Sequence, residues 1–319
     1  MLPEPALVDR FTADLDPLLA PGARLGVAVS GGPDSLALLI LAAAARPGLV
    51  EAATVDHGLR PEARDEAEFV ASICQRLSVP HAVLTARWNE VPQTAIQERA
   101  RDQRYRLLGY WAEERRLEAL ATGHHADDQV ETLLMRLARG SGVRGLAGMR
   151  RRSVAPGSHA RLIRPLLGWR RTELEQVASP LSPVSDPSNS DDRYERVRVR
   201  QALRELDWLD SQAVARSAAH LADADNALDW AARNEWKRSV TERHGAIAYR
   251  PGDAPAEIVR RIVGRAIRKL GTEGNADLRG PELDRLLAEL TAGGDSTIRG
   301  VRCSGGHEWR FTPAPPRTR

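Results

Sequence analysis

The sequence predicts an α/β protein with a doubly wound parallel sheet, and three observations support this fold class. Short apolar runs suited to buried strands alternate with helical patterns through the first half of the chain. A glycine- and serine-rich turn joins the first of these strands to an apolar helix. Polar residues with catalytic chemistry follow several strand ends, which is the edge where doubly wound sheets bind ligands.

Length and composition indicate a soluble globular protein with two domains. The chain has 319 residues, a formal net charge of +3 and 42% hydrophobic residues. Its longest apolar run, residues 36–45, is too short to span a bilayer, and the N-terminus lacks a basic segment followed by an apolar one. The 2 cysteines cannot form a disulfide framework. These features predict a cytoplasmic protein without a membrane partner.

The first predicted strand, residues 25–29, runs into residues 30–35, which we call the SGGPDS turn. An apolar helix starts directly afterwards. Glycines let the backbone approach a ligand closely, and a helix N-terminus offers free N–H groups and a dipole that favours anions. Ser30 and Ser35 add hydroxyl groups, and Ser35 or Asp34 can cap the helix. The turn is predicted to bind phosphate, and an ordinary strand-to-helix turn is the alternative.

Three more parallel strands are predicted at residues 49–55, 82–85 and 117–122. Helices are predicted at residues 61–78 and 94–116, after the second and third strands. The fourth strand runs into residues 123–129 and another helix through Arg139. Asp56 follows the second strand, and His124 to Asp128 follow the fourth. Because the carboxyl ends of parallel strands meet at one edge, these residues are expected to converge with Asp34 in an active site.

The rest of the chain is predicted to complete this sheet and then form a smaller α+β domain. Its predicted elements are a strand at 162–166, a loop at 184–189, a helix ending near 206, a long helix at 212–240, a strand at 247–249 and helices at 256–270 and 281–290. The predicted division is residues 1–210 for the doubly wound domain, 211–245 for a linking helix and 246–319 for a small C-terminal domain.

A long basic stretch lies between residues 132 and 172, where no aspartate or glutamate occurs. Its arginines are Arg136, Arg139, Arg144, Arg150, Arg151, Arg152, Arg161, Arg164, Arg170 and Arg171. A block of one charge is typical of a surface that contacts nucleic-acid phosphates, and a solvated face is the alternative.

Two other phosphate-binding motifs lack their required context. A Walker A loop needs a lysine after its last glycine, but Lys237 and Lys269, the only lysines, do not follow glycine. Gly140, Gly142 and Gly145 form a GxGxxG that follows a predicted helix rather than a strand. The SGGPDS turn therefore remains the candidate phosphate-binding site.

The SGGPDS turn resembles the PP-loop of the N-type ATP pyrophosphatases. Four further stretches, in order, resemble the tRNA(Ile)-lysidine synthetase family: VDHGLR at 55–60, residues 123–149, RPLL at 164–167 and DPSN at 186–189 with the arginines that follow. Val197 departs from the family, which commonly has a polar residue between these arginines.

This resemblance implies a ligase that adenylates the wobble cytidine in the CAU anticodon of isoleucine tRNA, using ATP, and then replaces AMP with free lysine. It implies that residues 1–210 are a PP-loop ATP pyrophosphatase (adenylation) domain and that the small domain at 246–319 binds tRNA. ATP and Mg²⁺ are the implied cofactors, the tRNA and L-lysine are the implied partners, and a homodimer is compatible with it. The implied nucleotide-binding residues are Ser30, Gly31, Gly32, Pro33, Asp34, Ser35, Val55, Asp56, Gly123 and His124.

The implied catalytic residues are Asp34, Asp128, Glu131, Arg104 and Arg200. Asp34 would hold Mg²⁺ beside the pyrophosphate, and Asp128 is the second implied metal ligand. Asp128 and Glu131, three residues apart on one helical face, would hold the lysine ammonium and take up its proton. Arg104 and Arg200 would offset charge on a phosphate or on the flipped-out base.

Several alternatives stay open at this level. A metal-dependent phosphohydrolase could use Asp56, His57 and the residues from His124 to Asp128 as ligands. A thiolating PP-loop enzyme commonly needs paired cysteines, whereas Cys74 stands alone on a predicted helix. An RNA-binding module could use the SGGPDS turn to grip backbone phosphate. For Asp127 a helix cap is favoured over catalysis, and for the two histidines a packing role is as well supported as a catalytic one.

Overall fold

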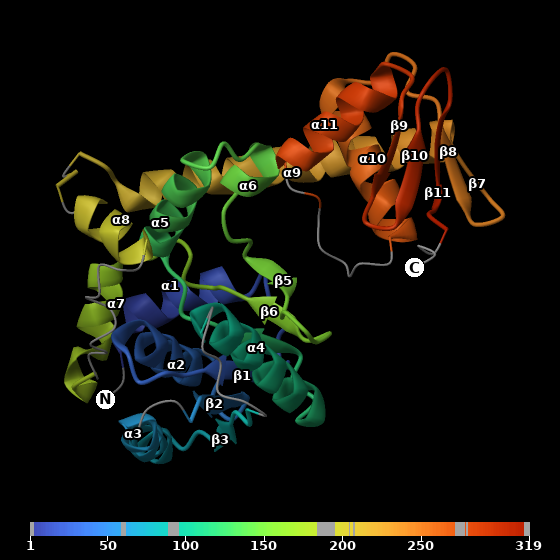
Figure 1. Ribbon diagram of the computed structural model, residues 1–319. Helices are drawn as coiled ribbons and strands as arrows, with labels where there is room; N and C mark the ends of the chain where they lie inside the picture. Colours follow the sequence, from blue (N-terminus) through green and yellow to red (C-terminus); the bar gives the residue numbers. More distant parts are fainter. Residues whose placement is uncertain are drawn as a thin grey trace. The chain divides into compact units, whose positions relative to one another are not determined.

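The computed structural model describes residues 3–58, 62–88, 96–183, 195–203, 205–206, 208–271, 278 and 280–315. The chain forms two compact units, Met1–His220 and Leu221–Arg319, and helix α9 (Ser211–Ser239) runs across the boundary between them (Figure 1). The three-part division at residues 210 and 245 stays a prediction. Within the described residues, no helix combines the length and apolar character that a membrane span requires.

A six-stranded sheet lies at the centre of the first unit (Figure 1). Across the sheet its strands are β3 (His81–Thr85), β2 (Val50–Asp56), β1 (Leu25–Ala28), β4 (Ala119–Ala121), β6 (Arg161–Ile163) and β5 (Arg152–Val154). The pairs from β3 to β6 are parallel, and β5 is antiparallel to β6. The predicted doubly wound parallel sheet is confirmed, and β5 is an edge strand that the sequence pattern does not predict.

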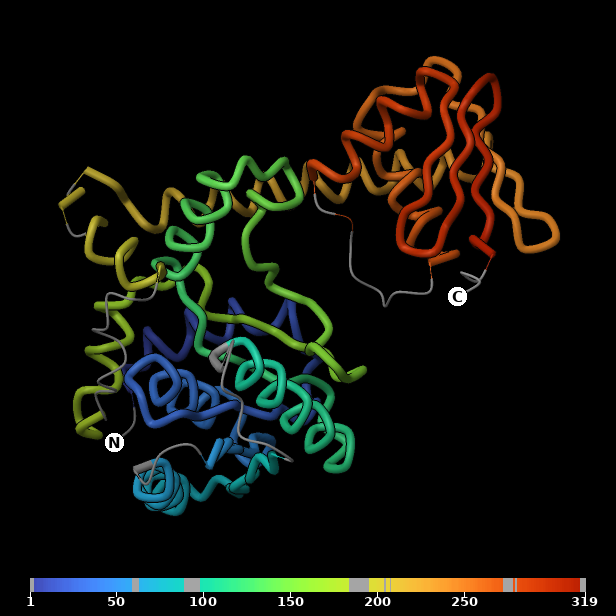
Figure 2. Tube along the Cα trace, viewed as in Figure 1, coloured from blue at the N-terminus to red at the C-terminus, as the bar shows by residue number. Residues whose placement is uncertain are grey.

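The helices of this unit follow the strands in the order expected of a doubly wound fold. They are α1 (Pro5–Leu15), α2 (Pro33–Ala45), α3 (Glu62–Arg76), α4 (Ile96–Glu114), α5 (Ala126–Leu137), α6 (Val143–Leu146), α7 (Arg171–Ala178) and α8 (Glu195–Leu203), with a 3₁₀ turn η1 (Ser179–Leu181). The tube in Figure 2 shows α1 and α2, both blue, beside each other at the start of the chain. Helices α1, α6 and α7 are additions to the predicted set.

Helix α2 is apolar all round because neighbouring elements cover it on several sides. It packs against α1, α7 and the sheet, and its residues from Ser35 to Ala42 are buried. Leu108 and Trp111 of α4 form a separate core group with Leu120 of β4 and Leu162 of β6. The neighbouring strand residues Ala121 and Ile163 point to the other face of the sheet and belong to the core group of α2. The two groups of helices thus cover opposite faces of the sheet.

The second unit contains an antiparallel sheet and two helices of its own. Its strands, in order across the sheet, are β7 (Val240–Arg243), β8 (Ala246–Tyr249), β11 (Trp309–Pro313), β10 (Val301–Ser304) and β9 (Asp295–Ile298), and its helices are α10 (Ala256–Leu270) and α11 (Gly280–Thr291). Trp236 of α9 joins Tyr249, Ile262 and Phe311 in the core of this unit. The predicted small α+β unit is confirmed.

Some predicted features lie outside the described residues. They are the loop at 184–189, residues 94–95 at the start of a predicted helix, and residues 59–61. The arginine-rich helix predicted to end near residue 206 ends at Leu203.

Candidate active site

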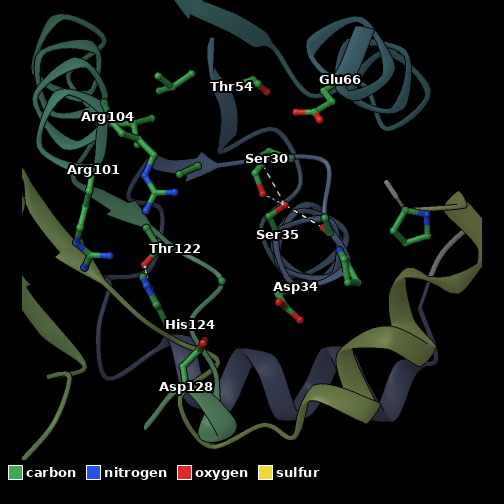
Figure 3. A pocket seen from close by; sticks show the side chains of 18 of the residues that line it. Ser30, Asp34, Ser35, Thr54, Glu66, Arg101, Arg104, Thr122, His124 and Asp128 are labelled. Carbon is green, nitrogen blue, oxygen red and sulfur yellow. Dashed lines mark hydrogen bonds between the residues drawn. The ribbon is translucent and has the colours of Figure 1, made fainter. Parts of the chain in front are cut away.

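A cavity of about 920 Å³ opens at the carboxyl ends of β1, β2 and β4 (Figure 3). It is lined by the SGGPDS turn, by the two neighbouring strand ends, and by side chains of α3, α4, α5, α7 and α8. The volume falls in the range of small-molecule and cofactor sites. The cavity lies at the predicted edge, where the reversal of strand order opens a crevice in an α/β sheet.

The SGGPDS turn is closed by its own hydrogen bonds. The Ser35 hydroxyl donates to the Gly32 carbonyl (3.0 Å) and accepts from the Ser30 N–H (3.1 Å). Gly31 has a φ of +82°, a conformation that favours glycine. Gly32 is the N-cap of α2 and no side chain caps this helix, so capping by Ser35 or Asp34 was a wrong prediction. The backbone N–H groups of the first turn are therefore the donors that the turn offers to an anion.

Gly123 brings the end of β4 against the SGGPDS turn. A Cβ at this position would lie 2.8 Å from the carbonyl oxygen of Asp34 and 3.2 Å from the nitrogen of Ser35. A larger residue would push the two strand ends apart. Gly123 thus makes the cavity possible by allowing this close approach.

His125 is buried at the centre of three carboxylates. Its Nε2 lies 3.5 Å from Oδ2 of both Asp34 and Asp128, and its Nδ1 lies 3.4 Å from Asp127 Oδ2. Burial alone would lower the pKa of His125, but the nearby carboxylates of Asp128, Asp127 and Asp34 raise this pKa to about 10. His125 is thus a cation at neutral pH. It connects Asp34 of the SGGPDS turn with Asp128 in the first turn of α5.

His124 has the opposite character. Its Nδ1 lies 2.8 Å from the Thr122 hydroxyl, and it lines the cavity beside Asp128 (Figure 3). Burial lowers the pKa of His124 to about 3, and the positive charges of Arg164 and Arg104 act in the same direction. His124 is therefore neutral at pH 7, and it can act in the site as a hydrogen-bonding group without charge.

We expect His124→Gln to make the protein less sensitive to acid. Below pH 6.5 the unfolded chain protonates His124 while the folded protein does not, so wild-type stability falls by about 1.4 kcal/mol per pH unit on account of this group. The loss should continue until the pH approaches the folded pKa of about 3. Urea unfolding measures the free energy of unfolding at pH 7 and at pH 4.5. Between these two pH values the variant should lose less stability than the wild type. An equal loss in both proteins would contradict a neutral His124.

A chain of ion pairs connects α5 to α8. Asp128 Oδ1 accepts a hydrogen bond from Arg196 Nη2 (2.5 Å), and Asp128 Oδ2 accepts from the His125 backbone N–H (3.0 Å). Glu131 pairs with Nε of Arg196 and with Nε of Arg200 (2.7 Å for Arg200). Burial alone would raise the pKa of Asp128, but the charges of His125 and Arg196 hold it below its usual value. Asp128 is therefore ionised at neutral pH.

Two arginines of α4 form another wall of the cavity. Figure 3 shows Arg101 and Arg104 on one side of the cavity and Glu66 of α3 on the other. Ser30 and Ser35 of the SGGPDS turn lie between these two sides. Their guanidinium carbons lie 5.2 and 5.3 Å from the ring centre of Tyr105, which is buried. The predicted Arg104 therefore faces the cavity, and Arg101 accompanies it.

Most of the predicted site residues line the cavity. They are Ser30, Gly32, Pro33, Asp34, Ser35, Val55, Arg104, Gly123, His124, Asp128 and Arg200. Gly31, Asp56 and Glu131 are not in its wall. Asp56 instead accepts a hydrogen bond from the Gly58 N–H (2.8 Å), which shapes the turn after β2. The positions of these three residues do not support the direct contacts with ligand that the sequence predicts for them.

Asp127 was expected to cap its own helix, α5, but it caps α7 instead. Its Oδ2 accepts from the backbone N–H of Arg171 (2.8 Å), the first residue of α7. This bond places α7 beside the cavity, where Arg171 and Glu175 join Glu66 as lining residues that the sequence pattern does not identify. No local signal marks them, because α3 and α7 reach the cavity only through packing.

Most arginines of the basic stretch contact other groups of the protein. Arg164 is buried and donates to the Arg150 carbonyl (2.8 Å), and Arg136 donates to the carbonyls of Gly145 (2.7 Å) and Gly148 (3.1 Å). Others form ion pairs with acidic residues elsewhere in the chain: Arg139 with Glu195, Arg151 with Asp14, Arg161 with Glu118, Arg170 with Asp210 and Arg171 with Glu175. Much of its charge therefore supports the fold.

The geometry bears on the metal and thiol alternatives. Among the residues that the structure describes, no group of three or more His, Cys, Asp or Glu side chains is placed to hold a metal ion. Burial raises the pKa of the Cys74 thiol to about 12, so it is a poor nucleophile. Asp34 Oδ1 is a buried acceptor without a hydrogen-bond partner, which fits a ligand-borne cation such as Mg²⁺. Asp128 fits less well, since both its oxygens already have donors.

Comparisons with known proteins agree with this geometry. Residues 6–206 match the family of PP-loop domains. The tRNA(Ile)-lysidine synthase of Novosphingobium aromaticivorans is 46% identical over 310 residues, which are 96% of this chain and 93% of the relative. The tRNA(Ile)-lysidine synthase of Zymomonas mobilis subsp. mobilis is 44% identical over 298 residues, or 92% and 89% of the two chains.

A solved structure shares the fold at low sequence identity. The U34-tRNA thiolase NcsA from Methanococcus maripaludis superposes with a TM-score of 0.56 and 17% identity, over 67% of this chain and 78% of that one. This likeness concerns the arrangement of the sheet and helices alone.

Proposed function

The chain belongs to the tRNA(Ile)-lysidine synthases of the PP-loop family, and we propose that its cavity joins free lysine to the wobble cytidine of an isoleucine tRNA at the expense of ATP. The observation that carries this proposal is the meeting of three features in one cavity. They are the phosphate-accepting SGGPDS turn, the ionised Asp128, and arginines on two different helices. An adenylation followed by attack of an amine needs these three kinds of group.

In the first step, the 2-keto oxygen of the cytidine in the CAU anticodon attacks the α-phosphorus of ATP, and pyrophosphate leaves. The SGGPDS turn would hold the pyrophosphate through the free N–H groups at the start of α2. Arg104 from one wall and Arg200 from another would offset the negative charge that builds up on the α-phosphate. The large cavity leaves room for both the nucleotide and an extruded base.

Asp34 would bind the metal that accompanies ATP. Its unpartnered Oδ1 lies in the turn that receives the phosphates, while Oδ2 faces the His125 cation. When bound, Mg²⁺ would neutralise charge on the leaving pyrophosphate. His125 would hold the Asp34 carboxylate through Oδ2, and Oδ1 would be left to bind the metal.

In the second step, the ε-amine of lysine attacks C2 of the adenylated cytidine, AMP leaves, and the attacking nitrogen gives up a proton. Asp128 is an ionised carboxylate in the wall beside the SGGPDS turn, so it would bind the lysine ammonium through the lone pairs that its two present donors do not use. Its pKa is held below the usual value, so it serves as an ammonium ligand first and as a proton acceptor second. A cytoplasmic location, a homodimer and tRNA binding by the C-terminal unit complete the proposal as predicted from the sequence.

Product analysis tests this function directly. The protein is incubated with ATP, labelled lysine and isoleucine tRNA with a CAU anticodon, and the nucleosides of the recovered tRNA are then separated. We expect labelled lysidine together with AMP and pyrophosphate. Release of inorganic phosphate instead would favour a phosphohydrolase, and absence of ATP turnover would favour an RNA-binding module.

We expect Arg152→Ala to weaken tRNA binding and to flatten its salt dependence. Arg152 is an exposed residue of edge strand β5, and no ion pair to a described residue holds it. One lost phosphate contact should reduce the slope of log K against log salt by about one unit. Filter binding over a range of salt concentrations measures this slope.

Arg24→Ala is the matched control for this prediction. Arg24 is a solvent-facing arginine next to the amino end of β1, away from the cavity, and it pairs with Glu51. Its variant should keep the wild-type slope. An unchanged slope in Arg152→Ala as well would mean that Arg152 belongs to a solvated surface.

A further inference from the structure

Glu131 lies behind the wall of the cavity. Its side chain is 3% exposed, and it is not one of the lining residues. Both carboxylate oxygens are engaged, since Oε1 accepts from Nε of Arg200 (2.7 Å) and Oε2 accepts from Nε of Arg196. A ligand could reach Glu131 only by displacing one of these arginines.

Arg196 and Arg200, in contrast, line the cavity. They are four residues apart on α8, so they project from one face of that helix. Glu131 holds each of them through Nε, which leaves the terminal nitrogens of the planar guanidinium for other acceptors. Arg196 uses Nη2 to bind Asp128 (2.5 Å).

From this arrangement we infer that Glu131 is a positioning residue, which fixes Arg196 and Arg200 so that their guanidinium groups bind a phosphate group in the cavity. The phosphate belongs either to the nucleotide or to the tRNA backbone. This inference rests on the proposed function, which supplies ATP and tRNA as the two ligands that carry phosphate. It differs from the sequence prediction, which gave Glu131 a direct contact with the lysine ammonium.

Electrostatics favours the positioning role. An ammonium that approached Glu131 from the cavity would first meet two guanidinium cations, and like charges repel at this distance. A phosphate would meet the same two cations and be attracted. Without Glu131 the two arginines would repel each other and lose the geometry that a planar fork needs to bind a phosphate.

Glu131→Gln tests this inference, because it keeps the shape of the side chain and removes its charge. Three quantities are measured: the Kd for ATP without tRNA or lysine, the Kd for tRNA with its salt slope, and the KM for lysine. We expect the Kd for ATP or for tRNA to rise about tenfold, on the scale of one charged hydrogen bond, with little change in lysine KM. Which Kd rises identifies the source of the phosphate.

The arginines provide a second measurement. Arg200→Lys keeps the positive charge but loses the Nε anchor, so it should weaken the same Kd. If Glu131 acts through the arginines, Arg200→Lys should raise the same Kd as Glu131→Gln and leave the lysine KM unchanged. A direct ligand role for Glu131 would instead raise the lysine KM in Glu131→Gln and leave the Kd values for ATP and tRNA unchanged.

Glu173→Gln is the matched control. Glu173 is a carboxylate of α7 in the same unit, it pairs with Arg10 at 2.6 Å, and it does not line the cavity. Its variant should keep all three wild-type values. Circular dichroism and thermal unfolding show whether each variant is folded. Should Glu131→Gln fail to fold, Glu131→Asp, which retracts the carboxylate, and Arg200→Lys carry the test with the same expected losses.

Two results would overturn the inference. One is a higher lysine KM in Glu131→Gln with unchanged Kd values for ATP and tRNA, which would make Glu131 a lysine ligand. The other is a folded variant with all three values unchanged. A wild-type protein that binds ATP but forms no lysidine would contradict the proposed function instead, and the Kd for ATP would still decide the role of Glu131.

Discussion

Replacing Asp34 with alanine is expected to abolish AMP formation while leaving the protein folded. Its Oδ1 is the unpartnered acceptor of the SGGPDS turn, where the metal and the pyrophosphate would lie. Its side chain is 34% exposed, so its removal leaves no cavity in the apolar core. Loss of a metal contact that acts on the leaving group should lower the adenylation rate by about a thousandfold or more. Release of pyrophosphate with saturating ATP and tRNA measures this rate.

Asp34→Asn separates the charge of this residue from its shape. The amide keeps one oxygen in the turn but loses the charge that faces both the metal and His125. We expect it to adenylate as poorly as Asp34→Ala, and to regain little activity at high Mg²⁺. Because His125 keeps two of its three carboxylates, thermal unfolding should shift only modestly. Adenylation near the wild-type rate in either variant would show that the metal role is wrong.

The part of the site that could be predicted consists of features that lie close together in the sequence. Strand, glycines and helix N-terminus follow one another within residues 25–45, and each depends on local backbone chemistry. The convergence of Asp34 with the stretch from His124 to Asp128 follows from a parallel sheet alone. These predictions hold because no distant contact is needed to make them.

What could not be predicted depends on contacts between distant segments. Glu131 and Asp128 do share a helical face, as their spacing of three indicates, since both bind Arg196. Which of them faces the ligand is decided by α8, a helix far along the chain. Likewise, the acidic partner Asp14 of Arg151 comes from α1, so a count of charges along the basic stretch overestimates its free charge.

His124 and His125 are neighbours in the sequence, yet their pKa values depend on distant segments that the sequence does not reveal. His124 is held neutral and His125 is held charged, although they are adjacent and begin from the same ordinary pKa. Burial lowers the pKa of both rings, but the three carboxylates around His125 outweigh it, whereas the arginines near His124 act in the same direction as burial. From the sequence alone, a catalytic and a packing role are equally supported for both, because neither surrounding is local.

Asp128→Asn should impair the use of lysine more than the use of ATP. Free lysine is almost wholly protonated at pH 7, and Asp128 is an ionised carboxylate of the cavity wall that can bind this ammonium. The amide keeps the size of the side chain but loses the charge. It also turns a donor toward either Arg196 or the His125 N–H, so it cannot satisfy both.

We therefore expect the KM for lysine to rise by about tenfold or more, while adenylation of the tRNA continues. Adenylated tRNA should then accumulate, and hydroxylamine should trap it. Asp127→Asn is the matched control: this neighbouring carboxylate caps α7 and is not a lining residue, so its variant should lose stability and keep its lysine KM. If adenylation disappears in Asp128→Asn while the lysine KM stays constant, Asp128 serves the cytidine or the metal, and the lysine ammonium must be held by another carboxylate of the wall such as Glu66 or Glu175.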